Sequence, residues 1–71
     1  MNISEANKAA KSGRAVVVFH HGHQEYIKCM VDYLFYDTDS QKTFAVCEMY
    51  NGIRFFTYPE SIVGYVRNIK D

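Results

Sequence analysis

Residues 2–12 place small apolar side chains at the three- to four-residue spacing of a helix. The stripe consists of Ile3, Ala6 and Ala10. Asn2, with Glu5 three positions later, matches a capping box, in which the two residues satisfy each other's backbone N–H groups. Gly13 accepts the left-handed conformation that ends many helices. The pattern therefore predicts one short helix over residues 2–12.

After Gly13, β-branched and aromatic runs are separated by turn residues. The expected strands are residues 15–19, 26–36, 43–50, 53–58 and 62–66. The cluster from Asp37 to Ser40 is a turn signal. Asn51-Gly52 is typical of a two-residue hairpin turn. We expect a mainly β (α+β) fold, with the helix followed by a five-stranded antiparallel barrel over residues 15–66, in a single domain spanning residues 1–71.

These two turns suggest a strand register. We take a two-residue turn at Asn51-Gly52 and a three-residue turn at residues 37–39. Lys28 then lies opposite Glu48 and Tyr26 opposite Tyr50, and such pairs of opposite charges and of aromatic rings favour this strand alignment. It remains a hypothesis, because a slip of one residue moves every side chain to the other face. The predicted pairs are Tyr26–Tyr50, Lys28–Glu48, Cys29–Cys47, Tyr36–Ser40, Cys47–Phe56 and Tyr50–Ile53.

In this register both faces of the sheet are largely apolar. The predicted core face carries Ile27, Cys29, Val31, Tyr33, Phe35, Ala45, Cys47, Met49, Phe56 and Tyr58. The second face carries Lys28, Asp32, Glu48 and Thr57, together with Met30, Leu34, Phe44, Val46, Ile53 and Phe55. A half-solvated sheet is normally polar on its outer face, and a large exposed apolar patch marks an interface. The alternative is that barrel curvature and the helix cover that face.

The candidate interface and ligand residues follow from this second face and from the strand ends. Tyrosine and arginine are over-represented at interface hot spots, and histidine can donate, accept or change charge near neutral pH. The candidates are Tyr26, Met30, Leu34, Tyr36, Phe44, Val46, Tyr50, Ile53, Arg54, Phe55, His21 and His23.

Charge and size narrow the function classes. Eight basic and eight acidic residues give zero net charge, whereas nucleic-acid binders normally carry a basic excess. RNA is therefore disfavoured as a partner. A chain of 71 residues buries a modest core, and small scaffolds are often stabilised by association. We expect a homo-oligomer, with a host protein or a small nucleotide as ligand.

The residues able to do chemistry do not form a recognisable set. His20, His21 and His23 lack the further ligands that zinc requires. Cys29 and Cys47 fall within strands on the predicted core face, where free cysteines act as small apolar residues. No phosphate loop or nucleophile motif is present. We expect no catalytic residues, no metal and no cofactor, and hence a protein that is not an enzyme.

The first residues, Met1 to Glu5, lack the basic and apolar regions of a signal peptide. No apolar run approaches the roughly 20 residues that cross a membrane. We expect a cytoplasmic protein with no membrane partner, whose thiols stay reduced.

The stretch from Ala15 to Val66, with a long second strand and the tight turn Pro59-Glu60-Ser61 before the last strand, resembles SH3-like and in particular Sm-like barrels. That resemblance implies an RNA-binding oligomer. The glycine that bends the second strand in Sm-like RNA binders is replaced here by Lys28-Cys29-Met30.

The opening segment from Ile3 to Arg14 is similar in style to short phage-encoded anti-defence proteins that sequester a nucleotide signal. This resemblance implies a phage or mobile-element origin, with the host cytoplasm as the location. The leading hypothesis is therefore a small non-enzymatic inhibitor that blocks or sequesters a host component. The alternative is an Sm-like RNA-binding oligomer.

Overall fold

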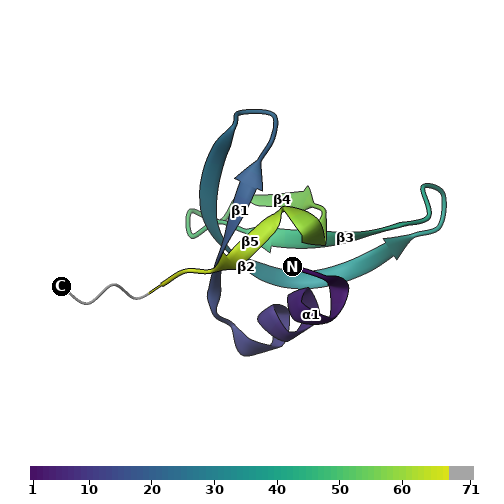
Figure 1. Cartoon of the computed structure of the whole chain (residues 1–71), viewed down its shortest axis with the longest axis horizontal. Helices are drawn as coiled ribbons and strands as arrows, with labels where there is room; N and C mark the ends of the chain where they lie inside the picture. The colour runs from purple at the N-terminus through teal and green to yellow at the C-terminus, as the bar shows by residue number, and fades with distance from the viewer. Residues whose placement is uncertain (68–71) are drawn as a thin grey trace.

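The computed structural model describes residues 1–67, which form a helix, a single five-stranded antiparallel sheet and one turn of 3-10 helix (Figure 1). In chain order the elements are α1 (Ile3–Ser12), β1 (Ala15–His20), β2 (Glu25–Asp37), β3 (Lys42–Glu48), β4 (Arg54–Thr57), η1 (Pro59–Ser61) and β5 (Ile62–Tyr65). The predicted order of elements is confirmed, and the predicted bounds are correct to within two residues. In the described part of the chain, no helix is long and apolar enough to cross a membrane.

Helix α1 begins with the predicted capping box. The Asn2 side chain accepts a hydrogen bond from the Glu5 N–H at 2.7 Å, and the Glu5 carboxylate accepts one from the Asn2 N–H at 2.9 Å. Gly13, at φ +69°, ends the helix in the left-handed conformation. Ala6 and Ala9 are the buried residues, so the face turned to the sheet differs by one position from the predicted stripe. Their small side chains let α1 pack closely along β2.

The strands lie in the order β4-β3-β2-β1-β5. Strand β2 is long because it pairs with two strands in succession. Its residues 25–30 pair with β1, and its residues 30–37 pair with β3. Figure 1 shows β2 curving between them. The edge strands β4 and β5 are not paired with each other among the described residues, so the sheet is open and the expected closure into a barrel is not seen.

The register of the β2–β3 hairpin differs from the prediction at its turn, and β2 also contains a bulge at Asp32. Val31 lies opposite Cys47, but Tyr33 lies opposite Val46, so Asp32 is the extra residue. Near the turn, the β2 partner of each β3 residue lies three positions later than predicted. The bulge reduces this offset to two, so Glu48 opposes Met30 and not Lys28. The turn is also one residue longer than expected, since the last pair is Asp37 with Lys42.

The loop of the β3–β4 hairpin, at Asn51-Gly52, is also one residue longer than predicted. The Gly52 N–H donates to the Met49 carbonyl at 2.8 Å, and the Met49 N–H donates to the Ile53 carbonyl at 2.8 Å. Three residues thus form the loop, with Gly52 at φ +90°, an arrangement that is also common in hairpins. As a result Cys47 opposes Phe55, not Phe56.

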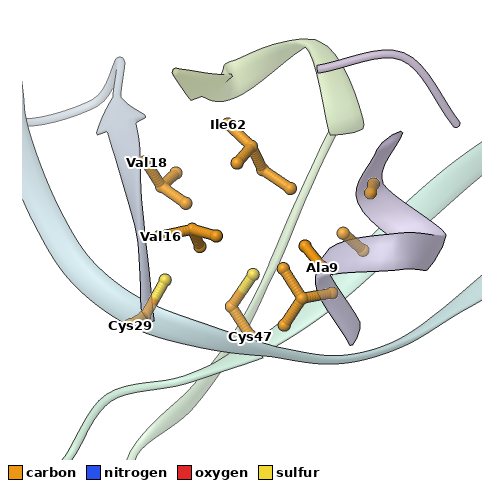
Figure 2. Close-up of a cluster of buried hydrophobic side chains, with 9 residues drawn as sticks. Ala9, Val16, Val18, Cys29, Cys47 and Ile62 are labelled. Atoms are coloured by element: carbon orange, nitrogen blue, oxygen red, sulfur yellow. The ribbon is translucent and has the colours of Figure 1, made fainter. Parts of the chain in front are cut away.

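The core collects small apolar side chains from α1 and four strands (Figure 2). It consists of Ala6, Ala9, Val16, Val18, Cys29, Val31, Ala45, Cys47 and Ile62. The large aromatic residues that were expected there instead lie at the surface, with exposed fractions between 36% and 69%, which corrects the predicted core. They are Tyr33, Phe35, Phe56 and Tyr58.

Candidate functional site: an exposed aromatic face

Two features decide which side chains point away from the core: the bulge at Asp32 and the three-residue loop of the β3–β4 hairpin. Beyond Asp32 the alternation of β2 is inverted, so Tyr33 and Phe35 lie on the side of the sheet away from the core. The one-residue shift in β4 turns Phe56 to that same side. We call the resulting cluster on β2, β3, β4 and the residue before η1 the aromatic face. It consists of Tyr33, Phe35, Phe44, Val46, Phe56 and Tyr58.

The rings of the aromatic face contact one another in a continuous array. Phe35 stacks on Phe44 with ring centroids 5.6 Å apart, and it meets Phe56 edge-on at 5.7 Å. Phe44 in turn stacks on Tyr58 at 5.1 Å. These distances and orientations are those that aromatic pairs prefer. The side chains therefore support one another and form a preorganised surface.

Solvent reaches this array directly. Phe56 is 69% exposed and Tyr33 is 51% exposed, while Val46 beneath them is 2% exposed although it lies outside the core cluster. Val46 is buried because its cross-strand partners, Tyr33 and Phe56, flank it on both sides. A contiguous apolar patch of this kind is uncommon on monomers and marks interaction sites.

A charged cluster borders the aromatic face at one end. The Arg54 guanidinium contacts the Asp32 carboxylate at 3.1 Å and the Glu48 carboxylate at 3.2 Å. The hydrogen bond to Glu48 and the charge of Asp32 raise the pKa of Arg54, so it stays charged. At the other end the Lys42 ammonium lies 5.3 Å from the Tyr58 ring centroid, a cation–π contact.

The histidines occupy the β1–β2 turn, away from the aromatic face. His20 and His23 stack at 4.9 Å, and the His20 Nδ1 accepts a hydrogen bond from the His23 N–H. His21 packs edge-on against Phe19 at 4.8 Å. Within the described part of the chain, no three His, Cys, Asp or Glu side chains come together as metal ligands would.

The two thiols, which are free, lie in the core (Figure 2). Cys29 and Cys47 are not opposite each other, since Cys47 pairs with Val31. The hydrogen bond between the thiols and their burial raise the pKa of Cys47. The same hydrogen bond lowers the pKa of Cys29. Both side chains are nevertheless buried in the core, out of reach of a reagent, so this pair serves packing.

The twelve residues predicted for the site fall in five places. Met30, Phe44, Val46 and Arg54 lie on the outer side of the sheet, in or beside the aromatic face. Leu34 and Phe55 turn inward and pack against the core, contrary to the predicted register. Tyr50 and Ile53 lie at the β3–β4 turn, and Tyr36 near the far end of β2. Tyr26 packs on Phe19 in the β1–β2 hairpin, where His21 and His23 also lie.

The sequence analysis missed four aromatic members of this surface because it assigned Tyr33, Phe35, Phe56 and Tyr58 to the core. One signal could have found Phe56. Pairing Glu48 with Arg54 across the hairpin favours opposite charges, and that register alone turns Phe56 outward. Nothing in the sequence marks Asp32 as a bulge.

No protein-family model, curated protein or solved structure matches this chain.

Proposed function

We propose that this protein is a small non-enzymatic binding protein that docks its aromatic face onto a partner protein. The observation that carries the proposal is the continuous array of exposed, mutually packed rings around Val46. Rings that are already packed lose little conformational freedom on binding, which is the general advantage of a preorganised surface. Large aromatic side chains also dominate the energy of protein interfaces.

The charged border supports a protein partner over a nucleic acid. Asp32 and Glu48 together outweigh Arg54, so the border carries net negative charge beside Tyr33 and Phe56. Phosphate groups would be repelled there, whereas the polar rim and apolar centre are the usual anatomy of a protein interface. Arg54 is held between two carboxylates, which keeps the rim ordered.

In this proposal the protein acts by occupying a surface of its partner, as an inhibitor would. A phage or mobile-element origin and self-association remain part of the hypothesis drawn from the sequence. On the outer side, Tyr33, Phe35 and Phe56 replace the predicted Leu34 and Phe55, while Phe44 and Val46 stay. This exchange supports an interface, because it exposes more aromatic rings than the predicted register did.

A second candidate is an Sm-like RNA-binding oligomer built on an SH3-like barrel. The exposed rings favour it, since aromatic side chains on a sheet can stack on unpaired bases. The curved β2 (Figure 1) and the turn η1 before β5 also fit that resemblance. Zero net charge and the two carboxylates at the border weigh against it.

Two matched variants test the proposal. Phe56→Asp places a charge in the aromatic face, and Tyr26→Asp places one at a similarly exposed ring, 67% against 69%, in the other hairpin. The immobilised wild-type chain and both variants are exposed to an extract of the source cells. We expect a protein that binds the wild-type chain and Tyr26→Asp and is lost with Phe56→Asp.

Each alternative gives a different result in the same experiment. Capture of RNA that is released by high salt would favour the Sm-like candidate. Native mass spectrometry of the three proteins separates self-association from hetero-association, because the monomer is 8.2 kDa. Equal capture by all three proteins would show that the aromatic face is not the docking surface.

A further inference from the structure

The loop of the β3–β4 hairpin brings together two groups that can react with each other. Asn51 carries a side-chain amide, and the backbone nitrogen of Gly52 follows it directly. Both residues are exposed, so water reaches them. Gly52 has no Cβ, the atom that would crowd the approach of its nitrogen to the Asn51 side chain. The loop therefore holds an electrophile beside an unhindered nucleophile.

The Asn51 side chain is folded back onto the backbone that follows it. Its Oδ1 atom accepts a hydrogen bond from the Ile53 N–H at 3.1 Å, which is the bond of an Asx turn. The ring that this bond closes contains the Gly52 nitrogen, so the side-chain carbonyl carbon, Cγ, stays near that nitrogen. The Ile53 N–H also stabilises the negative charge that develops on Oδ1 when a nucleophile adds to Cγ.

One hydrogen bond restrains the nucleophile. The Gly52 N–H donates to the Met49 carbonyl at 2.8 Å and closes the loop, so the nitrogen can attack only after this bond opens. The bond lies at an exposed hairpin end, where local opening costs little. A single hydrogen bond of ordinary strength slows the attack roughly two- to tenfold. The folded loop thus delays the reaction and does not prevent it.

The other asparagines among residues 1–67 lack this arrangement. Asn2 precedes Ile3, whose β-branched side chain crowds the next nitrogen, and the Asn2 side chain is engaged in capping α1. Asn7 lies inside α1, where the helix fixes the nitrogen that follows. Asn51 therefore differs from both in its neighbour and in its backbone.

We propose that Asn51 is a site of spontaneous deamidation. The Gly52 nitrogen gives its proton to hydroxide and forms a bond to Cγ of Asn51. The Cγ–Nδ2 bond breaks, and its nitrogen leaves as ammonia with a proton from water. Water then opens the cyclic imide: cleavage of the new N–Cγ bond gives aspartate, and cleavage of the bond to the main-chain carbonyl carbon gives isoaspartate. In total the chain gains one water, loses one ammonia and acquires a negative charge in the loop.

The isoaspartate product changes the loop that orients β4. Its main chain runs through Cβ and Cγ of the former Asn51, so the loop becomes one backbone atom longer. Loop length decides whether Phe55 or Phe56 opposes Val46, so this product should disturb the pairing of β3 with β4. The modification does not depend on what the aromatic face binds.

Peptide mapping tests the site directly. The folded protein is incubated in mildly alkaline buffer and then digested briefly with trypsin at mildly acidic pH. The digest contains residues 43–54, in which Asn51 is the single side-chain amide, and residues 1–8, which carry the control asparagines Asn2 and Asn7. We expect aspartate and isoaspartate in residues 43–54 and unchanged amides in residues 1–8. The denatured chain should react roughly two- to tenfold faster at Asn51.

Two variants test the identity of the nucleophile. Gly52→Ala should slow the reaction of the denatured chain several-fold, because its Cβ crowds the nitrogen. Gly64→Ala adds the same atom at a glycine in β5 and should leave the rate unchanged. The denatured chain is used for this comparison so that a change in loop conformation does not contribute.

Hydrogen exchange measured by NMR tests the effect on the loop. The Gly52 amide proton of the isoaspartate fraction should exchange several-fold faster than that of freshly prepared Asn51→Asp, which has the charge without the longer chain. Equal exchange in the two proteins would overturn the effect on the loop.

Three outcomes of the mapping would overturn the site itself. These are an intact amide in residues 43–54 of the folded protein when the denatured chain is fully converted, an equal rate in residues 1–8, and aspartate without isoaspartate. Equal rates for Gly52→Ala and the wild-type chain in denaturant would exclude attack by the Gly52 nitrogen.

Discussion

Phe55 and Phe56 are neighbours in β4 with opposite environments: Phe55 packs against the core, whereas Phe56 is 69% exposed in the aromatic face. Cross-strand pairing explains the difference, because Phe55 opposes the buried Cys47 and Phe56 opposes Val46 on the other side of the sheet. The pair therefore reports directly on the register that creates the site.

We expect Phe55→Ala to lower the free energy of unfolding by about 2 kcal/mol or more, since it leaves a cavity beside the core. Phe56→Ala should change it by less than about 1 kcal/mol, as is usual for surface positions. Chemical denaturation of the two variants measures the difference. Equal losses would show that the register of β4 is wrong.

The left-handed turn at Gly52 gives a second prediction. A Cβ at this position meets nothing within 4 Å, but its φ of +90° disfavours any side chain. Gly52→Ala should therefore cost about 1 kcal/mol through backbone strain alone. Gly64, in β5, has equal space and no such φ, so Gly64→Ala is the matched control and should have little effect. Similar stability of the two variants would contradict the three-residue loop.

The turn between β2 and β3 gives a prediction about pH. The Ser40 hydroxyl donates to the Asp37 carboxylate at 2.7 Å, and this hydrogen bond is the main cause that lowers the pKa of Asp37. We expect Ser40→Ala to raise the pKa of Asp37 toward its usual value, as followed by NMR titration of the carboxyl carbon. Ser4→Ala, in the distant helix, should leave the pKa of Asp37 unchanged.

The sign of the linked stability effect follows from this shift. The pKa of Asp37 is lower in the folded than in the unfolded protein, so the interaction stabilises the fold above the unfolded value of about 3.9. That contribution is lost as the pH falls through the lower folded pKa. Because the carboxylate is fully exposed, the titration curve is a more sensitive measurement than the unfolding curve.

The buried thiols give a prediction about reactivity. Cys47 is fully buried and Cys29 is 3% exposed, and the pKa of Cys47 is raised by the contact with Cys29 and by burial. We expect neither thiol to react with a disulfide reagent at pH 8 in the folded protein, and both to react in denaturant. Rapid reaction of one thiol without unfolding would show that the core opens locally.

Much of the local structure could be predicted from the sequence. The capping box of Asn2 and Glu5 depends on residues three positions apart, and the left-handed end of the helix depends on Gly13 alone. The five strands were recognisable because β-branched and aromatic runs are separated by turn residues. The surplus of apolar residues also indicated that a second face of the sheet would be apolar.

The membership of that face could not be predicted. Alternation along a strand assigns side chains to two sides, but a single bulge inverts the assignment for every later residue. Asp32 inverts β2, so Leu34 turns inward and Tyr33 turns outward. The same error of one residue at Gly52 exchanged Phe55 and Phe56.

The sequence by itself determined the helix, the number and order of the strands, the neutral charge and the excess of aromatic residues. These properties depend on composition and on contacts between residues close in the chain. Only the tertiary structure decided which rings are exposed, that Arg54 joins Asp32 to Glu48, and that hydrogen bonds hold Asn51 and Gly52 in a three-residue loop. Those features depend on the register between strands, which is selected by how α1 and the strands pack around one core and not by any one segment.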